Sequence, residues 1–231
     1  MNVFKKSIVY SALGLIMIGL TAIIIGAAFG GTTGNIKFGD TTDFSEEYSD
    51  IRIIDIEHSA GTLYIKTGDK FAIEGKDVYK DYFESKVKDG VWTVSDSTGR
   101  SGWFAGNFRV NIGRWKATHS SVTIYLPEGF VLDEVKIKLG AGKIEAEAIE
   151  TKKFTLQVGA GDVKIDNLIS ENSLIECGVG SIRIDGKISN DSNIECGVGS
   201  IRLNLSGDYS DYNYKVKVGL GAAFIGDNKY E

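Results

Sequence analysis

A Gly-x-Gly motif recurs along the C-terminal half of this chain at a constant spacing, and this repeat limits the possible folds more than any other feature. The copies are LGAGKI from Leu139, VGAGDV from Val158, CGVGSI from Cys177, CGVGSI from Cys196 and VGLGAA from Val218. Their first glycines lie at positions 140, 159, 178, 197 and 219, so every interval between neighbours is 19 except the last, which is 22. Four copies at one period indicate a repeated structural unit rather than a set of separate sites.

Apolar residues alternate with other residues on both sides of each glycine pair. In one copy Phe154, Leu156 and Val158 precede the glycines, and Val163 and Ile165 follow them. Such alternation predicts short strands with one buried face, and glycine permits a sharp corner between them. A repeat this short cannot enclose a core alone, so we predict that the coils stack in parallel. The predicted fold class is therefore all-β, a parallel β-solenoid preceded by one transmembrane helix.

The predicted outward positions are mostly polar. Glu176 and Glu195 fall in one column, and Arg183 and Arg202 fall in another. Like charges on adjacent coils are mildly destabilising unless the two columns pair with each other. We interpret both columns as a solvated face rather than as a site.

A long uncharged segment precedes the repeats. Ser7–Phe29 would span about 35 Å as a helix, which is enough to cross a bilayer. Lys5 and Lys6 lie before it, and no basic residue follows until Lys37. This asymmetry predicts a cell-membrane protein with a single N-terminal span, a cytoplasmic N-terminus and an extracytoplasmic C-terminal domain. The alternative is a cleaved signal peptide, whose apolar region should be shorter.

These patterns divide the chain into five parts. They are a cytoplasmic tip with the transmembrane helix (1–30), a linker (31–50), an irregular β region or N-terminal cap (51–126), the regular repeats (127–226) and a tail (227–231). Within the irregular region the segment from Ser59 to Ile65 is a degenerate copy of the repeat. Solenoids need caps because an open end exposes strand edges.

One loop of the irregular region is rich in aromatic residues. It extends from Gly99 to His119 and carries Trp103, Phe104, Phe108 and Trp115. Clustered aromatic side chains often anchor interfaces, so these four residues are the predicted partner contacts. The alternative is that the same rings plug the end of the solenoid.

Net charge and cysteine content exclude some classes of protein. The chain carries a net charge of −5, and the part after the uncharged segment is more acidic still. Nucleic acids and anionic polymers need a basic surface, so we expect no nucleic-acid partner. Two cysteines are too few for a disulfide-stapled scaffold.

The repeat and its flanks resemble a known family. The string VTIYLPEG from Val122, the Gly-x-Gly copies and the degenerate copy near Ser59 resemble the bacterial β-strand-repeat family labelled "putative adhesin". The segment GAAFGG from Gly26 is also similar to Gram-positive, membrane-anchored members. This resemblance implies a cell-envelope protein with a parallel β-solenoid domain and no known catalytic residues.

Few residues suggest a metal or cofactor site. Asp162 follows its glycine pair as in a calcium β-roll, but the other copies lack an aspartate at that position. The glycine pairs never extend to Gly-x-Gly-x-x-Gly followed by a helix, so we expect no dinucleotide. His58 falls on an inward strand position, which favours a hydrogen-bonded core histidine over a metal ligand. We therefore predict no catalytic, cofactor-binding or metal-binding residue.

Cys177 and Cys196 lie one period apart in a single inward column. They should meet on adjacent coils, within range of a disulfide. We favour two small core residues, because parallel in-register Cβ vectors suit the bridge poorly.

The preferred function is a non-enzymatic envelope protein whose solenoid presents an adhesion or binding surface to an unknown envelope protein or glycan. The alternative is an envelope-stress sensing or regulatory component acting through a membrane partner. A polysaccharide-active enzyme is less favoured. Asp166 and Asp185 stack in one column, but a flat ladder does not give the two carboxyl groups across a cleft that an inverting glycosidase needs.

Overall fold

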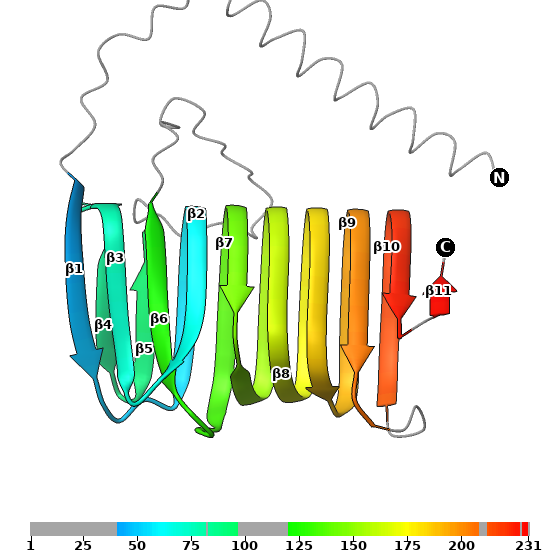
Figure 1. Ribbon diagram of the computed structural model, residues 1–231, viewed down its shortest axis with the longest axis horizontal. Coiled ribbons are helices and arrows are strands. Elements are labelled where there is room, and N and C mark those ends of the chain that lie inside the picture. The colour runs from blue at the N-terminus through cyan, green and yellow to red at the C-terminus, as the bar shows by residue number, and fades with distance from the viewer. Residues whose placement is uncertain (1–40, 82, 97–119, 208–211, 227, 231) are drawn as a thin grey trace, which may run out of the picture. The chain divides into compact units, whose positions relative to one another are not determined.

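The described part of the chain is built entirely from β-strands (Figure 1). The computed structural model describes residues 41–81, 83–96, 120–207, 212–226 and 228–230. In these residues eleven strands form one continuous sheet. The strands are β1 (Thr41–Tyr48), β2 (Ile53–Gly68), β3 (Phe71–Tyr79), β4 (Glu84–Lys88), β5 (Val91–Ser95), β6 (Ser121–Pro127), β7 (Leu132–Ala146), β8 (Ile149–Ile188), β9 (Asn190–Leu205), β10 (Tyr212–Ile225) and β11 (Asn228–Tyr230).

The repeats stack in parallel with the register that their period predicts. Gly142 pairs with Gly161, and Gly180 pairs with Gly199. The coil of β10 keeps the register although its interval is longer, because Gly199 pairs with Gly221. The inserted residues therefore lie before Tyr212. The predicted parallel stacking of coils is confirmed at the level of strand register.

The degenerate copy is the first coil of the same stack. β2 pairs in parallel with β7 along its length, and Gly61 faces Gly142. The regular stack therefore begins at Ile53, within the region expected to be irregular. The degenerate copy predicted at Ser59–Ile65 shares the Ala-Gly pair of the LGAGK corner, and that pair keeps the same register.

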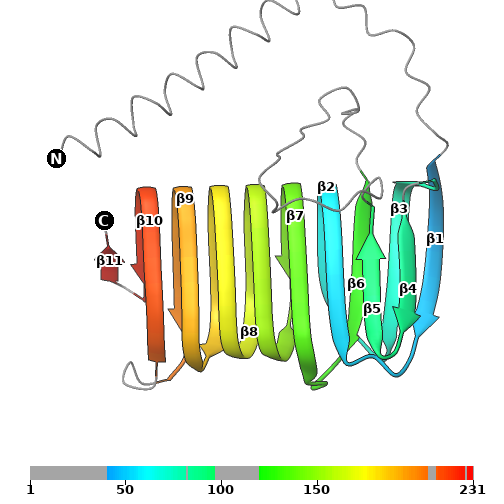
Figure 2. The same ribbon diagram turned by 180° about the vertical axis from the view of Figure 1, so that it is seen from behind.

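One further parallel coil and an antiparallel layer lie beyond β2. β5 pairs with the first half of β2 and β6 pairs with the second half, both in parallel. β4 and β3 then pair antiparallel with β5 and β6, and β1 pairs antiparallel with β3. Figure 2 shows β4 and β5 on the face that is hidden in Figure 1. Antiparallel strands thus cover the end of the parallel stack.

Two segments differ from the expected division of the chain. Thr41–Tyr48 was expected in the linker but forms β1, because Phe44 packs on Phe83 and Tyr48 packs on Trp92. Acidic residues between these rings hide the alternation in the sequence. β11 lies within the expected tail and pairs antiparallel with the end of β10.

Inward side chains form continuous apolar columns along the solenoid. One column contains Ile56, Ile137, Leu156, Ile175 and Ile194, each at most 1% exposed. Burial of one such side chain stabilises a fold by about 1.5–3 kcal/mol, so the columns supply the core. At the β5 end the core is closed by rings, since Trp92 is fully buried and contacts Tyr48 and Phe71.

The corner glycines are required by close contact between neighbouring coils. Gly180 has φ +145°, and a Cβ placed there would lie 1.8 Å from the carbonyl oxygen of Gly161. Gly178 has an ordinary φ, but its Cβ would still lie 2.5 Å from the carbonyl oxygen of Gly159. Each corner therefore packs backbone against backbone, which only glycine allows.

The predicted transmembrane segment Ser7–Phe29 lies outside the described residues. Among the residues that are described, no helix is long and apolar enough to cross a membrane.

Candidate binding surface at the corner edge

The Gly-x-Gly corners lie along one edge of the sheet, here called the corner edge, and one coil departs from the pattern there. In β2 the corner between Glu57 and Thr62 consists of residues 58–61. In the neighbouring coil of β5 and β6 the corresponding corner consists of residues 96–120, although the flanking Ser95 and Ser121 pair with Glu57 and Thr62. The residues 96–120 that connect these two strands are here called the expanded corner, and they include the aromatic loop predicted from the sequence.

The N-terminal end of the expanded corner is fixed by Asp96. Its carboxylate lies 2.5 Å from Nδ1 of His58 and accepts a 2.6 Å hydrogen bond from the backbone N–H of Ser59. Its own backbone N–H donates to the carbonyl oxygen of Glu57. Asp96 is thereby held against the corner of β2 by three separate contacts.

The C-terminal end is fixed by Ser120 at the same corner. Its carbonyl oxygen accepts a hydrogen bond from the N–H of Thr62, and its hydroxyl donates to the carbonyl oxygen of Ala60. A Cβ added at Gly61 would lie 2.6 Å from the Ser120 carbonyl oxygen and 3.0 Å from Nε2 of His58. Both ends of the expanded corner are therefore bonded to the corner of β2 and its flanking residues.

His58 is a buried, hydrogen-bonded histidine, as predicted from its inward position, and its partner is the carboxylate of Asp96. Its side chain is 3% exposed, and its Nε2 has no hydrogen-bond partner among the described residues. The hydroxyl of Ser120 is bonded to Ala60 rather than to Nε2. Although the fold brings a serine, a histidine and an aspartate together, the serine is not activated by the imidazole in this geometry. The cluster fixes the ends of the corner.

The four predicted contact residues lie outside the described residues. They are Trp103, Phe104, Phe108 and Trp115. The structure instead locates the two positions from which this segment starts and to which it returns.

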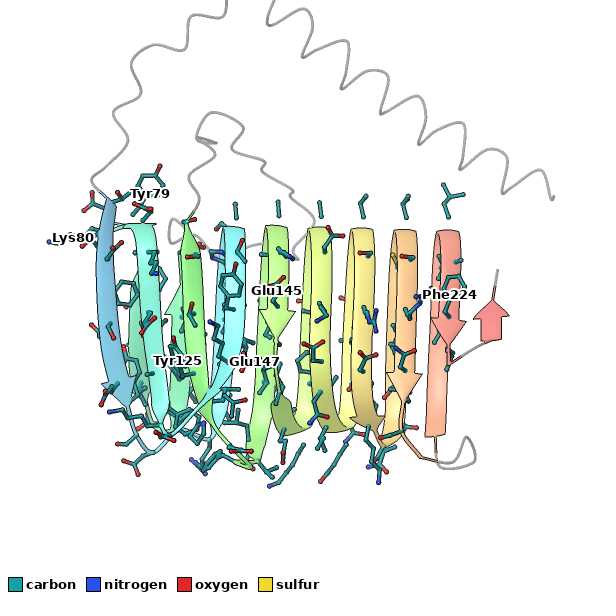
Figure 3. The ribbon with its side chains drawn as sticks, viewed as in Figure 1. Tyr79, Lys80, Tyr125, Glu145, Glu147 and Phe224 are labelled. Atoms are coloured by element: carbon teal, nitrogen blue, oxygen red, sulfur yellow. The ribbon has the colours of Figure 1, made fainter. Side chains whose placement is uncertain are left out.

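The two polar columns lie on opposite strands of each coil, so they cannot pair with each other. Each like-charged residue finds a partner on its own face. Gln157 donates to Glu176, and Lys217 pairs with Glu195. Arg183 pairs with Asp185, and Arg202 lies over the ring of Phe224 (Figure 3).

These contacts hold each charged side chain on its own face. The hydrogen bond from Lys217 lowers the pKa of Glu195 below its usual value, with a smaller effect from Asn193. Glu195 and Arg183 are balanced by Lys217 and Asp185, whereas Glu176 and Arg202 keep their charge and contact neutral groups. Such partly paired, exposed charges are typical of a solvated face.

The stacked aspartates are also engaged within their own face. Asp162 accepts a hydrogen bond from Ser181 in the next coil. Asp166 pairs with Lys164, and the Asn204 amide donates to Asp185. No group of three or more metal-ligating side chains occurs among the described residues.

Cys177 and Cys196 face each other across adjacent coils as free thiols. Both are at most 5% exposed and belong to the inward column that begins at His58. Burial raises the pKa of the Cys177 thiol to about 12, and the neighbouring Cys196 adds to the rise. Neutral buried thiols are poor nucleophiles, so the pair acts as core.

One feature of the corner edge was missed in the sequence. The residue between each pair of glycines is apolar, and at the last three corners it is also large. Val179 is 54% exposed, Val198 is 44% exposed and Leu220 is 49% exposed. These three side chains, here called the apolar ridge, are aligned because their residues pair in register. The signal was the progression from alanine to valine to leucine in the repeat itself.

A second missed feature is a polar depression near β9 and β10. Ser173 and Ser192 stack in a column that is otherwise apolar, and their hydroxyl groups have no hydrogen-bond partner among the described residues. The residues that line it are Ser173, Asp191, Ser192, Asn193 and Lys215. The change from Phe154 to a serine one period later opens this space, which has the polarity and room to hold water.

Several solved structures are similar to this chain. A "putative cell adhesion protein" from Clostridium sporogenes is 17% identical, with 80% of this chain and 99% of that chain covered and a TM-score of 0.45. A "putative adhesin" from Bacteroides fragilis is 16% identical, with coverages of 80% and 96% and a TM-score of 0.35. A "putative lipid binding protein" from Parabacteroides distasonis is 14% identical, with coverages of 82% and 95% and a TM-score of 0.30.

No curated protein matches the chain. The family model named Toastrack DUF4097 matches residues 51–215, which is well over half of the sequence and includes β2 to β9. The chain therefore belongs to the Toastrack DUF4097 family.

Proposed function

We propose that this protein is a non-catalytic, membrane-anchored component of the cell envelope whose solenoid presents an adhesion or binding surface. The observation that carries the proposal is the expanded corner. All other corners of the described stack are short and tightly packed, whereas this one is long and has both ends bonded to the corner of β2. A rigid scaffold that positions a variable segment is the usual arrangement of a binding loop.

The alternative role of the aromatic residues was to plug the end of the solenoid. Described residues already close that end, because Trp92 is fully buried between Tyr48 and Phe71. Its indole N–H donates to the hydroxyl of Ser85, so the ring is also satisfied as a polar group. This closure favours partner contact as the role of Trp103 and Trp115.

Membrane attachment is the second part of the proposal. It is supported by the uncharged segment Ser7–Phe29 and by Lys5 and Lys6 before it. Extraction of cell membranes with alkaline carbonate tests it. We expect the full chain to remain in the pellet, and its release would contradict the anchor.

The binding surface is tested by replacing residues 97–119 with a short Gly-Ser linker that keeps Asp96 and Ser120. We expect the thermal midpoint to stay unchanged, because the end contacts are kept. We also expect loss of the proteins or glycans that cross-link to the wild-type chain in intact cells. The double variant Trp103→Ala and Trp115→Ala should lose capture in the same way while keeping the length of the segment.

Two outcomes would contradict the binding surface. Undiminished capture by both variants would show that the partner binds elsewhere. A large fall in thermal midpoint of the double variant would show that the rings belong to the core of the cap.

A further inference from the structure

We propose that the corner edge meets the lipid bilayer at its β8–β10 end, where the apolar ridge of Val179, Val198 and Leu220 contacts the lipid. This inference rests on the proposed membrane anchor. The ridge is anomalous for a protein that is surrounded by water, because corners are normally occupied by polar residues. Here the corner position is apolar in every copy of the repeat.

The ridge forms one strip rather than isolated exposed residues. Val179 pairs with Val198, and Val198 pairs with Leu220, so the three side chains lie on successive coils about 4.8 Å apart. Single exposed apolar residues need no explanation, but a row of them on successive coils indicates a contact.

The residues beside the apolar ridge have a low free-energy cost of desolvation. On one side the neighbouring outward residues are Ser181, Ser200 and Ala222, none of which is charged. On the other side Glu195 is paired with Lys217, and Glu176 accepts a hydrogen bond from Gln157. The Glu195–Lys217 pair can approach a headgroup region without leaving an isolated ion behind, and the Glu176 carboxylate keeps its hydrogen bond there.

The polypeptide enters the described domain at the same edge. β1 begins at Thr41, which pairs with Tyr79 at the end of β3. β3 runs toward the corner edge, because its residue Lys76 pairs with Ser121, the first residue of β6. Figure 1 shows the start of β1 and the corners along the upper edge.

The proposed transmembrane segment therefore joins the domain at the corner edge, which brings the bilayer near this edge. The segment between Phe29 and Thr41 bridges at most about 40 Å when extended. The tether enters at the β1 end, whereas the ridge lies at the opposite end, on the last turn of β8, on β9 and on β10. Contact of the ridge with lipid would hold the β8–β10 end of the corner edge on the bilayer, with both polar faces left in water. The length of the tether allows the β1 end to stand away from the bilayer, so the expanded corner stays accessible to a partner.

The test uses the full-length chain in phosphatidylcholine vesicles. A Val198→Cys variant is labelled with an environment-sensitive fluorophore, and the matched control carries the label at Glu128→Cys, in the turn at the opposite edge. Native Cys177 and Cys196 are buried and should not react. We expect nitroxide-bearing lipids to quench the label at 198 several-fold more than the label at 128. Adding Val179→Asp and Leu220→Asp should abolish that difference.

Each other outcome overturns the proposal in a recognisable way. Equal quenching at both positions, in a chain that resists carbonate extraction, would refute the lipid contact and leave the anchor intact. Release of the chain by carbonate would refute the anchor and the lipid contact together. A blue-shifted label at 198 without lipid quenching would show that protein covers the ridge. Replacement of residues 97–119 would then identify that segment as the cover, and concentration dependence would identify a second copy.

Discussion

The corner of β2 and the corner between β5 and β6 occupy neighbouring coils of one stack, yet one consists of residues 58–61 and the other of residues 96–120. The short corner is enclosed on both sides. Gly61 faces Gly142 in the next coil, and Ser120 lies against it from the coil beyond. The long corner has a parallel coil on one side only, because β3 and β4 pair antiparallel with its strands.

This difference explains where the fold can accept new sequence. Inside the stack, adjacent corners approach so closely that even a methyl group at Gly199 would lie 1.8 Å from a carbonyl oxygen. An insertion there would separate two coils and break their hydrogen bonds. At the outermost coil an insertion can leave the stack from one side without displacing a neighbour. The solenoid therefore accepts a long insertion more readily at its end than within the stack.

The strongest test of the enclosed corners is Gly180→Ala. The substitution combines a positive φ with backbone overlap, and we expect a loss of about 2–6 kcal/mol in the free energy of unfolding. Urea unfolding followed by circular dichroism would measure it. The matched control is Gly129→Ala, which has φ +68° but no atom within 4 Å of the added Cβ, so it should cost only about 1–2 kcal/mol. Equal costs for the two variants would show that the coils are not in close contact at their corners.

The expanded corner is tested by Asp96→Ala. The substitution removes the partner of a buried imidazole and leaves the Ser59 N–H without its acceptor, so we expect a loss of about 1–3 kcal/mol. Asp166→Ala is the control, since its carboxylate pairs with Lys164 on the exposed face and should contribute little. If both variants unfold at the same urea concentration, the ends of the expanded corner are not fixed by Asp96.

The repeat predicted the architecture from sequence because its constraint is local and periodic. Each Gly-x-Gly corner and its flanking alternation imply the same coil. The constant spacing gives the register of β7 to β9, and the aligned glycines give that of β10. The inward position of His58 was also predictable from alternation. Its partner Asp96 was not, because a long stretch of cap and strand separates the two in the chain.

The candidate site was only partly predictable for the same physical reason. The aromatic segment stands out by composition, but its position as an expanded corner depends on the pairing of Ser95 with Glu57 and of Ser121 with Thr62. These long-range pairs leave no periodic signal. The apolar ridge was visible as a pattern, but its meaning depends on exposure, which only the fold reveals.

The buried thiol of Cys177, in the inward column next to the corners, predicts how the stability of the fold depends on pH. Because burial raises the pKa of Cys177 from 9.0 to about 12, the folded state holds the proton more tightly than the unfolded state does. The resulting stability is fully present below the unfolded pKa of 9.0 and is lost as the pH rises through about 12. Urea midpoints should therefore fall more steeply with alkaline pH for the wild type than for Cys177→Val. Parallel curves would show that this thiol titrates alike in both states.

The smallest expected effect separates the glycines of a corner from the residue between them. Val198→Ser should change the free energy of unfolding by less than about 0.5 kcal/mol in the lipid-free chain, because the valine is 44% exposed and packs no column. In contrast, Gly199→Ala should lower the free energy of unfolding by as much as Gly180→Ala does. Such a result would mean that the corner glycines determine stability and the residue between them does not. The change of that residue from alanine to valine to leucine along the edge would then need another explanation, and contact with lipid supplies one. A cost well above this value would instead mean that protein already covers the ridge, which would undermine both its exposure and its assignment to the bilayer.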